Sequence, residues 1–139
     1  MSLVSIRAAL ENALDGVDEE SEDFPTAYEN AEYTPIIGTA YQEAFLLPAE
    51  PDNPTMDDNH HREQGLFQVS LHYPIKAGSG AALTRAELIK ATFYRGASFS
   101  YGGITVRIEK TPEVPQGYRE DNNWWLQPVR IRWFADIFR

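Results

Sequence analysis

The sequence predicts an α+β fold in two layers, with a mainly antiparallel mixed sheet of about five to six strands and two helices packed on one face. Two segments repeat apolar residues at the three- and four-residue spacing of a helix, whereas others alternate with the period of two that strands show. The 139 residues, 42% of them hydrophobic, are enough for one core. We therefore expect a single domain over residues 1–139.

The first helix is predicted over residues 2–17. Ser2 is a suitable N-cap, and Gly16 is a suitable stop. The residues of its apolar stripe are Leu3, Ile6, Leu10, Ala13, Leu14 and Val17. An acidic stretch follows at residues 18–23, where like charges repel and no apolar side chain is available for burial. We expect this stretch to be an exposed linker.

Two strands and two connections are predicted next. Residues 24–30 favour a short strand, and Pro and Gly mark residues 33–38 as a turn-rich connection. Residues 41–47 favour a strand that ends at Pro48. Residues 49–64, rich in Pro and Asp, are predicted to form a long loop, and loops of that length are usually functional or mobile.

The clearest strand spans residues 67–73, because its apolar and polar residues alternate. The core side is expected to hold Phe67, Val69, Leu71 and Tyr73. The solvent side is expected to hold Gln68, Ser70 and His72. His72 is thus predicted to be an ordinary residue of the sheet surface.

The second helix follows Gly78-Ser79-Gly80. The run from Thr84 to Glu87 has the form of a capping box, with Leu83 and Leu88 as its hydrophobic staple. Ser79 offers an earlier start, which would line up one apolar face. That face would comprise Ala82, Ala86, Ile89 and Phe93. Both starts remain open, and Gly96 is the expected stop.

A hairpin and a final strand complete the predicted sheet. Gly102 and Gly103 suit a tight two-residue turn within residues 99–108, and residues 111–123 are expected to form a polar loop. The last strand is predicted over about residues 124–134. One face of this strand would carry Trp125, Val129, Ile131 and Trp133. The uncovered face of the sheet would carry Arg107, Arg130 and Arg132.

The net charge of −9 is unevenly distributed. Residues 1–63 hold 15 acidic residues against two arginines, whereas residues 64–139 hold 6 acidic and 10 basic residues, a net +4. An acidic chain is unsuited to holding nucleic acid, which requires a basic footprint. The unequal halves would instead attract one another between copies of the chain. A solvated surface of uneven charge is the alternative.

Residues that carry chemistry are sparse. The absence of cysteine excludes disulfides, thiolate zinc sites and thiol nucleophiles. Asp57, His60 and His61 form the only cluster that resembles a metal site, but residues so close in sequence rarely converge on one ion, so a solvated loop is favoured. Ser79 lacks the outer glycines of a nucleophile elbow. We therefore predict no catalytic residue, no cofactor and no metal.

Two other function classes remain as alternatives. One is a small metal-dependent hydrolase that uses His60, His61 and Asp57. The other is a monomeric ligand-binding domain with an aromatic pocket near Trp124 and Trp125, although tryptophans are more often core or interface anchors. No apolar run approaches the length of a membrane span, and the start lacks the pattern of a signal peptide, which predicts a soluble chain made in a cytoplasm.

Several short segments, taken together in order and spacing, resemble the tail terminators of long-tailed, non-contractile bacteriophages, in the group similar to the lambda terminator. The resemblance extends from about Ile6 to Trp133. It is carried by Ala27-Tyr28-Glu29-Asn30 with Pro35, Leu46-Leu47-Pro48-Ala49-Glu50, Gly65-Leu66-Phe67-Gln68-Val69, Tyr73-Pro74, Gly78-Ser79-Gly80, Phe93-Tyr94-Arg95-Gly96 and Pro128-Val129-Arg130-Ile131. The acidic stretch and the loop around His60 match no pattern of the family.

The resemblance implies a structural, non-enzymatic subunit of the virion tail, assembled in the cytoplasm of the bacterial host. Such a subunit closes into a six-fold ring on the head-proximal end of the tail tube, stops tube polymerisation and presents a surface to the head connector. Its partners would be its own copies, the tube protein and the head connector, with DNA passing through unbound and no membrane involved. A head-completion or stopper protein is the alternative within this class.

A candidate interface follows from the resemblance and the charge pattern together. We expect Arg107, Arg130 and Arg132 to meet carboxylates of a neighbouring subunit or of the tube. The acidic candidates for such contacts are Asp18, Glu19, Glu20, Glu22 and Asp23. The long loops at residues 49–64 and 111–123 are expected to become ordered on assembly.

Overall fold

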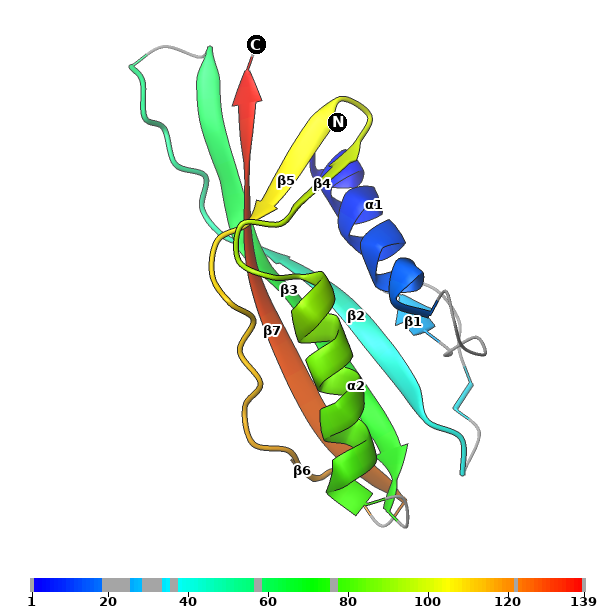
Figure 1. Cartoon of the computed structure of the whole chain (residues 1–139). Helices are drawn as coiled ribbons and strands as arrows, with labels where there is room; N and C mark the ends of the chain where they lie inside the picture. Colours follow the sequence, from blue (N-terminus) through cyan, green and yellow to red (C-terminus); the bar gives the residue numbers. More distant parts are fainter. Residues whose placement is uncertain are drawn as a thin grey trace.

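The computed structural model describes residues 2–18, 26–28, 34–35, 38–56, 59–75, 78–121 and 123–138 (Figure 1). The helices are α1 (Ser2–Asp15) and α2 (Gly78–Thr92), and a 3-10 turn, η1 (Gly16–Asp18), continues α1. The strands are β1 (Thr26–Tyr28), β2 (Tyr41–Pro48), β3 (His60–Pro74), β4 (Ser98–Tyr101), β5 (Ile104–Ile108), β6 (Tyr118–Arg119) and β7 (Trp124–Phe138). The predicted α+β class is confirmed.

The strands form one curled, mixed sheet in the order β1-β2-β3-β7-β5-β4, with β6 paired to β7 beside this path. Only the β1–β2 pair is parallel among these strands, so the sheet is mainly antiparallel, as predicted. The described residues hold seven strands, one more than the upper end of the prediction. The additional strand is the two-residue β6, which lies inside the segment 111–123 that was expected to be a loop.

Both helices contribute to one hydrophobic core. Ile6, Leu10 and Leu14 of α1 are fully buried, as the stripe in the sequence predicted. Figure 1 shows α1 beside β4 and β5, and α2 along β3 and β7. The sheet supplies Phe67, Val69, Val106, Ile108, Val129, Ile131 and Trp133 to the same core. The two-layer arrangement with both helices on one face stays a prediction, because the curled sheet has no single flat face.

The second helix begins at Gly78, close to the earlier of the two predicted starts, but Ser79 lies inside the helix and is not its cap. The capping box at Thr84 is wrong: Thr84 lies inside the helix, and its hydroxyl donates to the Gly80 carbonyl at 2.9 Å. The proposed staple residues Leu83 and Leu88 are about half exposed. The alternative apolar face is instead fully buried, at Ala82, Ala86, Ile89 and Phe93.

The predicted hairpin is confirmed by β4 and β5. Gly102 and Gly103 occupy its turn with φ angles of 58° and 81°, in the left-handed region that L side chains rarely adopt. Gly96, with φ at 88°, lies in the turn between α2 and this hairpin, where the Ala97 NH donates to the Tyr94 carbonyl at 2.9 Å. Its predicted role as the helix stop is wrong, because α2 already ends at Thr92.

β3 and β7 are both longer than the sequence predicted. They pair over 15 residues, from His60 opposite Phe138 to Pro74 opposite Trp124. The expected loop over residues 49–64 is therefore wrong at its C-terminal end. Long-range pairing with β7 holds residues 60–64 extended, although these polar residues show no apolar alternation.

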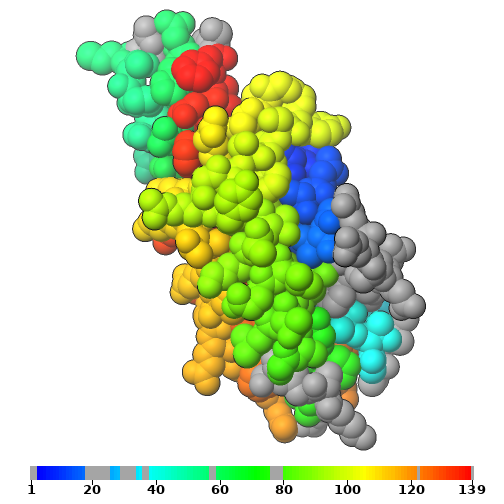
Figure 2. Space-filling model, viewed as in Figure 1, coloured from blue at the N-terminus to red at the C-terminus, as the bar shows by residue number. Residues whose placement is uncertain are grey.

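The paired ends of β3 and β7 form an arm that extends beyond the helices. We define the arm as residues 49–56, 60–64 and 134–138. Backbone hydrogen bonds between Asp52 and Arg62, at 2.9 and 2.7 Å, attach the first of these segments to β3. In the space-filling view the arm projects from the body at the upper left (Figure 2).

Candidate functional site

Alternation along β7 divides the strand into two chemically different sides. Val129, Ile131 and Trp133 are fully buried, whereas Arg130 and Arg132 between them are exposed. Successive side chains of a strand point to opposite faces, so the predicted alternation of the last strand is confirmed.

Arg107 of β5 joins Arg130 and Arg132 on the same side of the sheet. Its partner in the register is Phe134, which shares the side of Arg130 and Arg132 because all three have even numbers in β7. Its neighbours Val106 and Ile108 are buried in the core. The structure thus brings three predicted interface residues together, and we call this surface the arginine side.

A short segment after β5 folds over the arginine side. The Glu109 backbone NH donates to the Arg132 carbonyl at 2.9 Å, and Glu113 and Arg130 exchange two backbone hydrogen bonds of 2.9 Å each. Between these attachments, residues 110–112 stand away from β7, with Pro112 buried. The segment is therefore fixed at both ends by backbone hydrogen bonds, a geometry that does not depend on side-chain charge.

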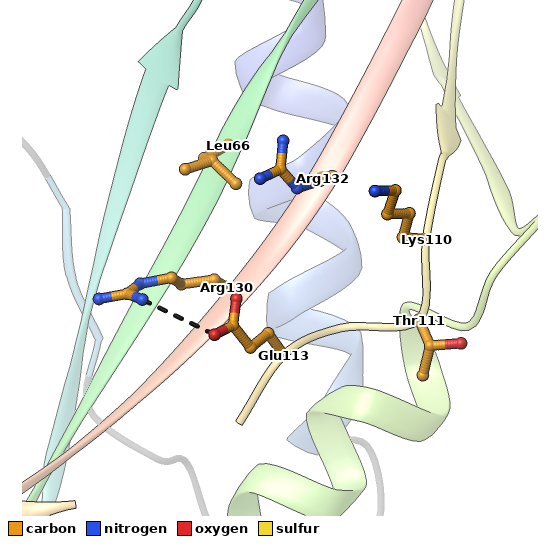
Figure 3. A pocket seen from close by; sticks show the side chains of 6 residues that line it. All are labelled: Leu66, Lys110, Thr111, Glu113, Arg130 and Arg132. Atoms are coloured by element: carbon orange, nitrogen blue, oxygen red, sulfur yellow. Dashed lines mark ion pairs between the residues drawn. The ribbon is translucent and has the colours of Figure 1, made fainter. Parts of the chain in front are cut away.

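The segment and the strands enclose a pocket of about 230 Å³. We call it the basic pocket, and its lining residues are Leu66, Lys110, Thr111, Glu113, Arg130 and Arg132 (Figure 3). β3 contributes Leu66, and β7 contributes the two arginines. Figure 3 shows the Lys110 amine directed toward Arg132, and Arg130 directed toward Glu113.

The basic pocket holds more positive than negative charge. Its three cationic side chains face a single carboxylate, Glu113, whose Oε1 lies 3.9 Å from Arg130 Nη1. With exposed fractions of 43% for Arg130 and 64% for Glu113, this pair contributes little to stability. Within the described ranges, no carboxylate forms an ion pair with Lys110 or Arg132. The pocket can therefore accept a further carboxylate, a group that guanidinium forks bind in bidentate fashion.

The arm contains a separate network of charged and aromatic groups. Arg62 donates to both oxygens of Asp136, from Nε at 2.9 Å and from Nη2 at 3.2 Å. His60 Nε2 lies 3.0 Å from Asp136 Oδ1, and the His60 ring stacks on Phe138. The Arg62 guanidinium also lies over the Phe134 ring, 4.3 Å from its centroid. Hydrogen bonding from Arg62 lowers the pKa of Asp136.

The histidines of the arm show no arrangement typical of a metal site. His60 pairs with Asp136, whereas His61 pairs with Glu63 at 3.0 Å. As neighbours in β3, the two histidines point to opposite faces of the strand. Asp57 lies outside the described residues. In the part of the chain that the structure describes, no three His, Cys, Asp or Glu side chains are grouped to hold a metal ion.

His72 is not the exposed surface residue that the sequence predicted. Only 3% of His72 is exposed, because its ring stacks on Tyr41 at 4.4 Å and meets the edge of Trp124. Its Nε2 lies 2.6 Å from Glu43 Oε1, and Glu120 approaches its Nδ1 at 3.5 Å. Ser70, also predicted on the solvent side, is only 5% exposed, so the predicted solvent face of β3 is wrong at this end. At His72, aromatic side chains of β2 and β7 cover that face.

The acidic candidates are largely outside the described part of the chain. Asp18 is the last residue of η1. Glu19, Glu20, Glu22 and Asp23 lie outside the described residues, so their contacts stay a prediction. Conversely, the sequence did not lead to Lys110 and Glu113, although a lysine two residues after the end of the predicted hairpin was a usable signal.

The fold and the site together define an α+β protein with a basic pocket on the solvent side of its sheet. The chain matches the phage tail terminator protein family over residues 5–133 and belongs to that family. It is therefore a structural protein associated with the phage tail. One solved structure is similar to this chain with a TM-score of 0.80 and 26% sequence identity, over 96% of this chain and 95% of that chain. No curated protein matches the chain. No helix in the described ranges is long and apolar enough to span a membrane.

Proposed function

We propose that this protein caps the head-proximal end of the tail tube as a ring, ends tube polymerisation and forms the surface that joins tail to head. The match to the tail terminator family over residues 5–133 carries this proposal. We further propose that the chain makes and breaks no covalent bond, and that it joins the virion tail during assembly in the host cytoplasm.

The distribution of charge supports a ring built from identical copies. A ring of head-to-tail contacts uses two different patches on each subunit, and these patches must complement one another. The arginine side supplies a basic patch, and residues 1–63 supply most of the acidic residues. The expected ring is six-fold, with the tube protein and the head connector as its other partners.

The net charge also suits a channel through which DNA passes. A chain of net charge −9 repels the phosphate backbone, so DNA would move past it without specific binding. Among the exposed surfaces, the arginine side is the one that we assign to protein contacts, since its cations are grouped with an acceptor pocket.

Electron microscopy of the purified protein mixed with tail tubes tests this function. We expect ring-shaped density at one end of each tube, with two-dimensional averages showing six-fold symmetry. A matched sample of filled heads is the control for the alternative connector role. Density on heads and none on tubes would favour a head-completion or stopper protein, and bare tubes together with bare heads would contradict both.

A further inference from the structure

We propose that the basic pocket is the acceptor for carboxylates from the acidic stretch, residues 18–23, of a second copy of this chain. This inference rests on the proposed function, because it assumes that copies associate side by side in a ring. It deepens that function by naming the donor segment and the acceptor pocket of the contact between copies.

The pocket is built to receive a carboxylate. Lys110, Arg130 and Arg132 line the pocket from two backbone segments that hydrogen bonds hold together, so the backbone that carries the cations is positioned before any partner arrives. Figure 3 shows Lys110 directed toward Arg132, whereas the Arg130 guanidinium extends away from both. Positioning in advance reduces the entropy that association would otherwise cost. Leu66 contributes an apolar side chain to the lining of the pocket, and hydrogen bonds between guanidinium and carboxylate groups are stronger than neutral ones.

The internal carboxylate does not neutralise the pocket. Glu113 approaches Arg130 only at 3.9 Å, beyond hydrogen-bond distance, and both side chains are well exposed. The two remaining cations have no carboxylate partner within the described residues. One or two further carboxylates would therefore balance the pocket.

A second copy is the occupant that the charges favour. Residues 1–63 carry 15 acidic residues against two basic ones, so every copy brings an acidic donor together with a basic acceptor. Each copy would then donate to one neighbour and accept from the other, which is the pattern of a closed head-to-tail ring. Nucleic acid is disfavoured because the acidic remainder of the chain repels phosphate.

Intermolecular paramagnetic relaxation gives a direct test. The chain contains no cysteine, so Ser21→Cys provides one unique position for a nitroxide label. Spin-labelled protein is mixed with an equal amount of protein that carries no spin label but is enriched in ¹⁵N. Line broadening is then measured in the spectrum of the ¹⁵N-enriched copy. We expect broadening at the amides of Lys110, Thr111 and Glu113 and of residues 130–132. The proposal would be overturned if broadening occurred only at amides outside the pocket, or if no amide were broadened at millimolar protein concentration.

Charge reversal sharpens the test. Arg130→Glu with Arg132→Glu in the ¹⁵N copy should reduce the broadening about tenfold or more, because like charges would then face one another. The matched control, Arg95→Glu with Arg119→Glu, makes the same change of charge at exposed arginines outside the pocket and should leave the broadening unchanged. Equal losses in both variants would overturn the proposal.

The complementary reversal should restore the contact. When the labelled copy carries Glu19→Lys with Glu22→Lys, broadening in wild-type protein should be lost, and it should return when the ¹⁵N copy carries the reversed pocket. If the broadening did not return when the two charge-reversed copies were mixed, a direct contact would be contradicted. In a separate titration, duplex DNA that competes away the broadening at low micromolar concentration would indicate a phosphate site instead and would also overturn the proposal.

The outcome is independent of the tube experiment. If wild-type protein caps tubes but shows no contact at the pocket, this inference fails and the proposed function stands. If the pocket contact is present but tubes are never capped, the proposed function fails while association through the pocket remains.

Discussion

The two sides of β7 differ sharply in burial and in charge. On the core side, Val129, Ile131 and Trp133 have no exposed surface. On the arginine side, the residues between them are cations that reach solvent and a basic pocket. The same strand therefore separates two tasks: one side holds the fold together, and the other is available for contacts with other chains. Changes on the two sides should accordingly affect different properties.

The largest effect on stability is expected from Trp133→Ala. Trp133 is the largest fully buried side chain, and truncating a buried aromatic residue to alanine typically costs about 3–5 kcal/mol of unfolding free energy. Urea denaturation followed by circular dichroism measures the loss. Arg132→Ala, one position away on the other side of β7, should change stability by less than about 0.5 kcal/mol. Similar losses in the two variants would contradict the division of β7.

Gly65→Ala should have the next largest effect. Gly65 lies opposite Trp133 in the register, and a Cβ there would meet the Leu47 carbonyl oxygen at 2.4 Å and Pro48 Cα at 2.9 Å. Since these are backbone atoms of β2, the strand itself must move, at a cost of about 1–3 kcal/mol. Gly80→Ala is the matched control, because a Cβ there meets nothing within 4 Å and alanine favours the helix. We expect denaturation midpoints to fall for the first variant and to rise or stay unchanged for the second.

Asp136→Asn should weaken the arm by about 1 kcal/mol or less at neutral pH, since both partners of its ion pair are partly exposed. The pKa of Asp136 is lowered below its ordinary 3.8 in the folded state, so the stabilisation is present above that value and is lost as pH falls through the folded pKa. The difference in stability between wild type and variant should therefore shrink below about pH 4.

Hydrogen exchange at the amides of residues 60–64 and 134–138 locates this effect in the arm. Glu87→Gln, on the exposed surface of α2, is the control and should leave exchange in the arm unchanged. If the difference in arm exchange rates between wild type and Asp136→Asn grew as the pH was lowered, the carboxylate would not be stabilised by Arg62.

The smallest effect on stability is expected from Arg130→Glu combined with Arg132→Glu. Both side chains are exposed, and the only ion pair that either makes within the described residues is the weak one with Glu113. We expect a change of less than about 0.5 kcal/mol in unfolding free energy. A loss of several kcal/mol would show that the arginine side also supports the fold.

Local patterns in the sequence predicted the parts of the fold that depend on local chemistry. The stripe of α1 and the alternation of β7 are decided by which side chains can be buried, so both were correct. The start of α2 was ambiguous because Thr84 and Ser79 both satisfy the rules of a helix cap, and only the burial of Ala82 and Ala86 distinguishes them.

Long-range contacts account for the errors. Residues 60–64 look like a loop because their extended form depends on partners in β7 that are 70 to 78 residues away in the sequence. His72 looks exposed because the sequence of β3 does not reveal that Tyr41 and Trp124 cover it. Of the candidate site, the three arginines were predicted, whereas Lys110 and Glu113 required the two attachments of their segment to β7.

The most direct measurement of the central claim is the length of tail tubes polymerised from purified tube protein in the presence of this chain. Wild-type protein and the Arg95→Glu, Arg119→Glu control should stop elongation and give short tubes of narrow length distribution. The Arg130→Glu, Arg132→Glu variant, with its fold intact, should let elongation continue as though no protein had been added. If this variant stops elongation as well as wild type does, the arginine side is not the assembly surface.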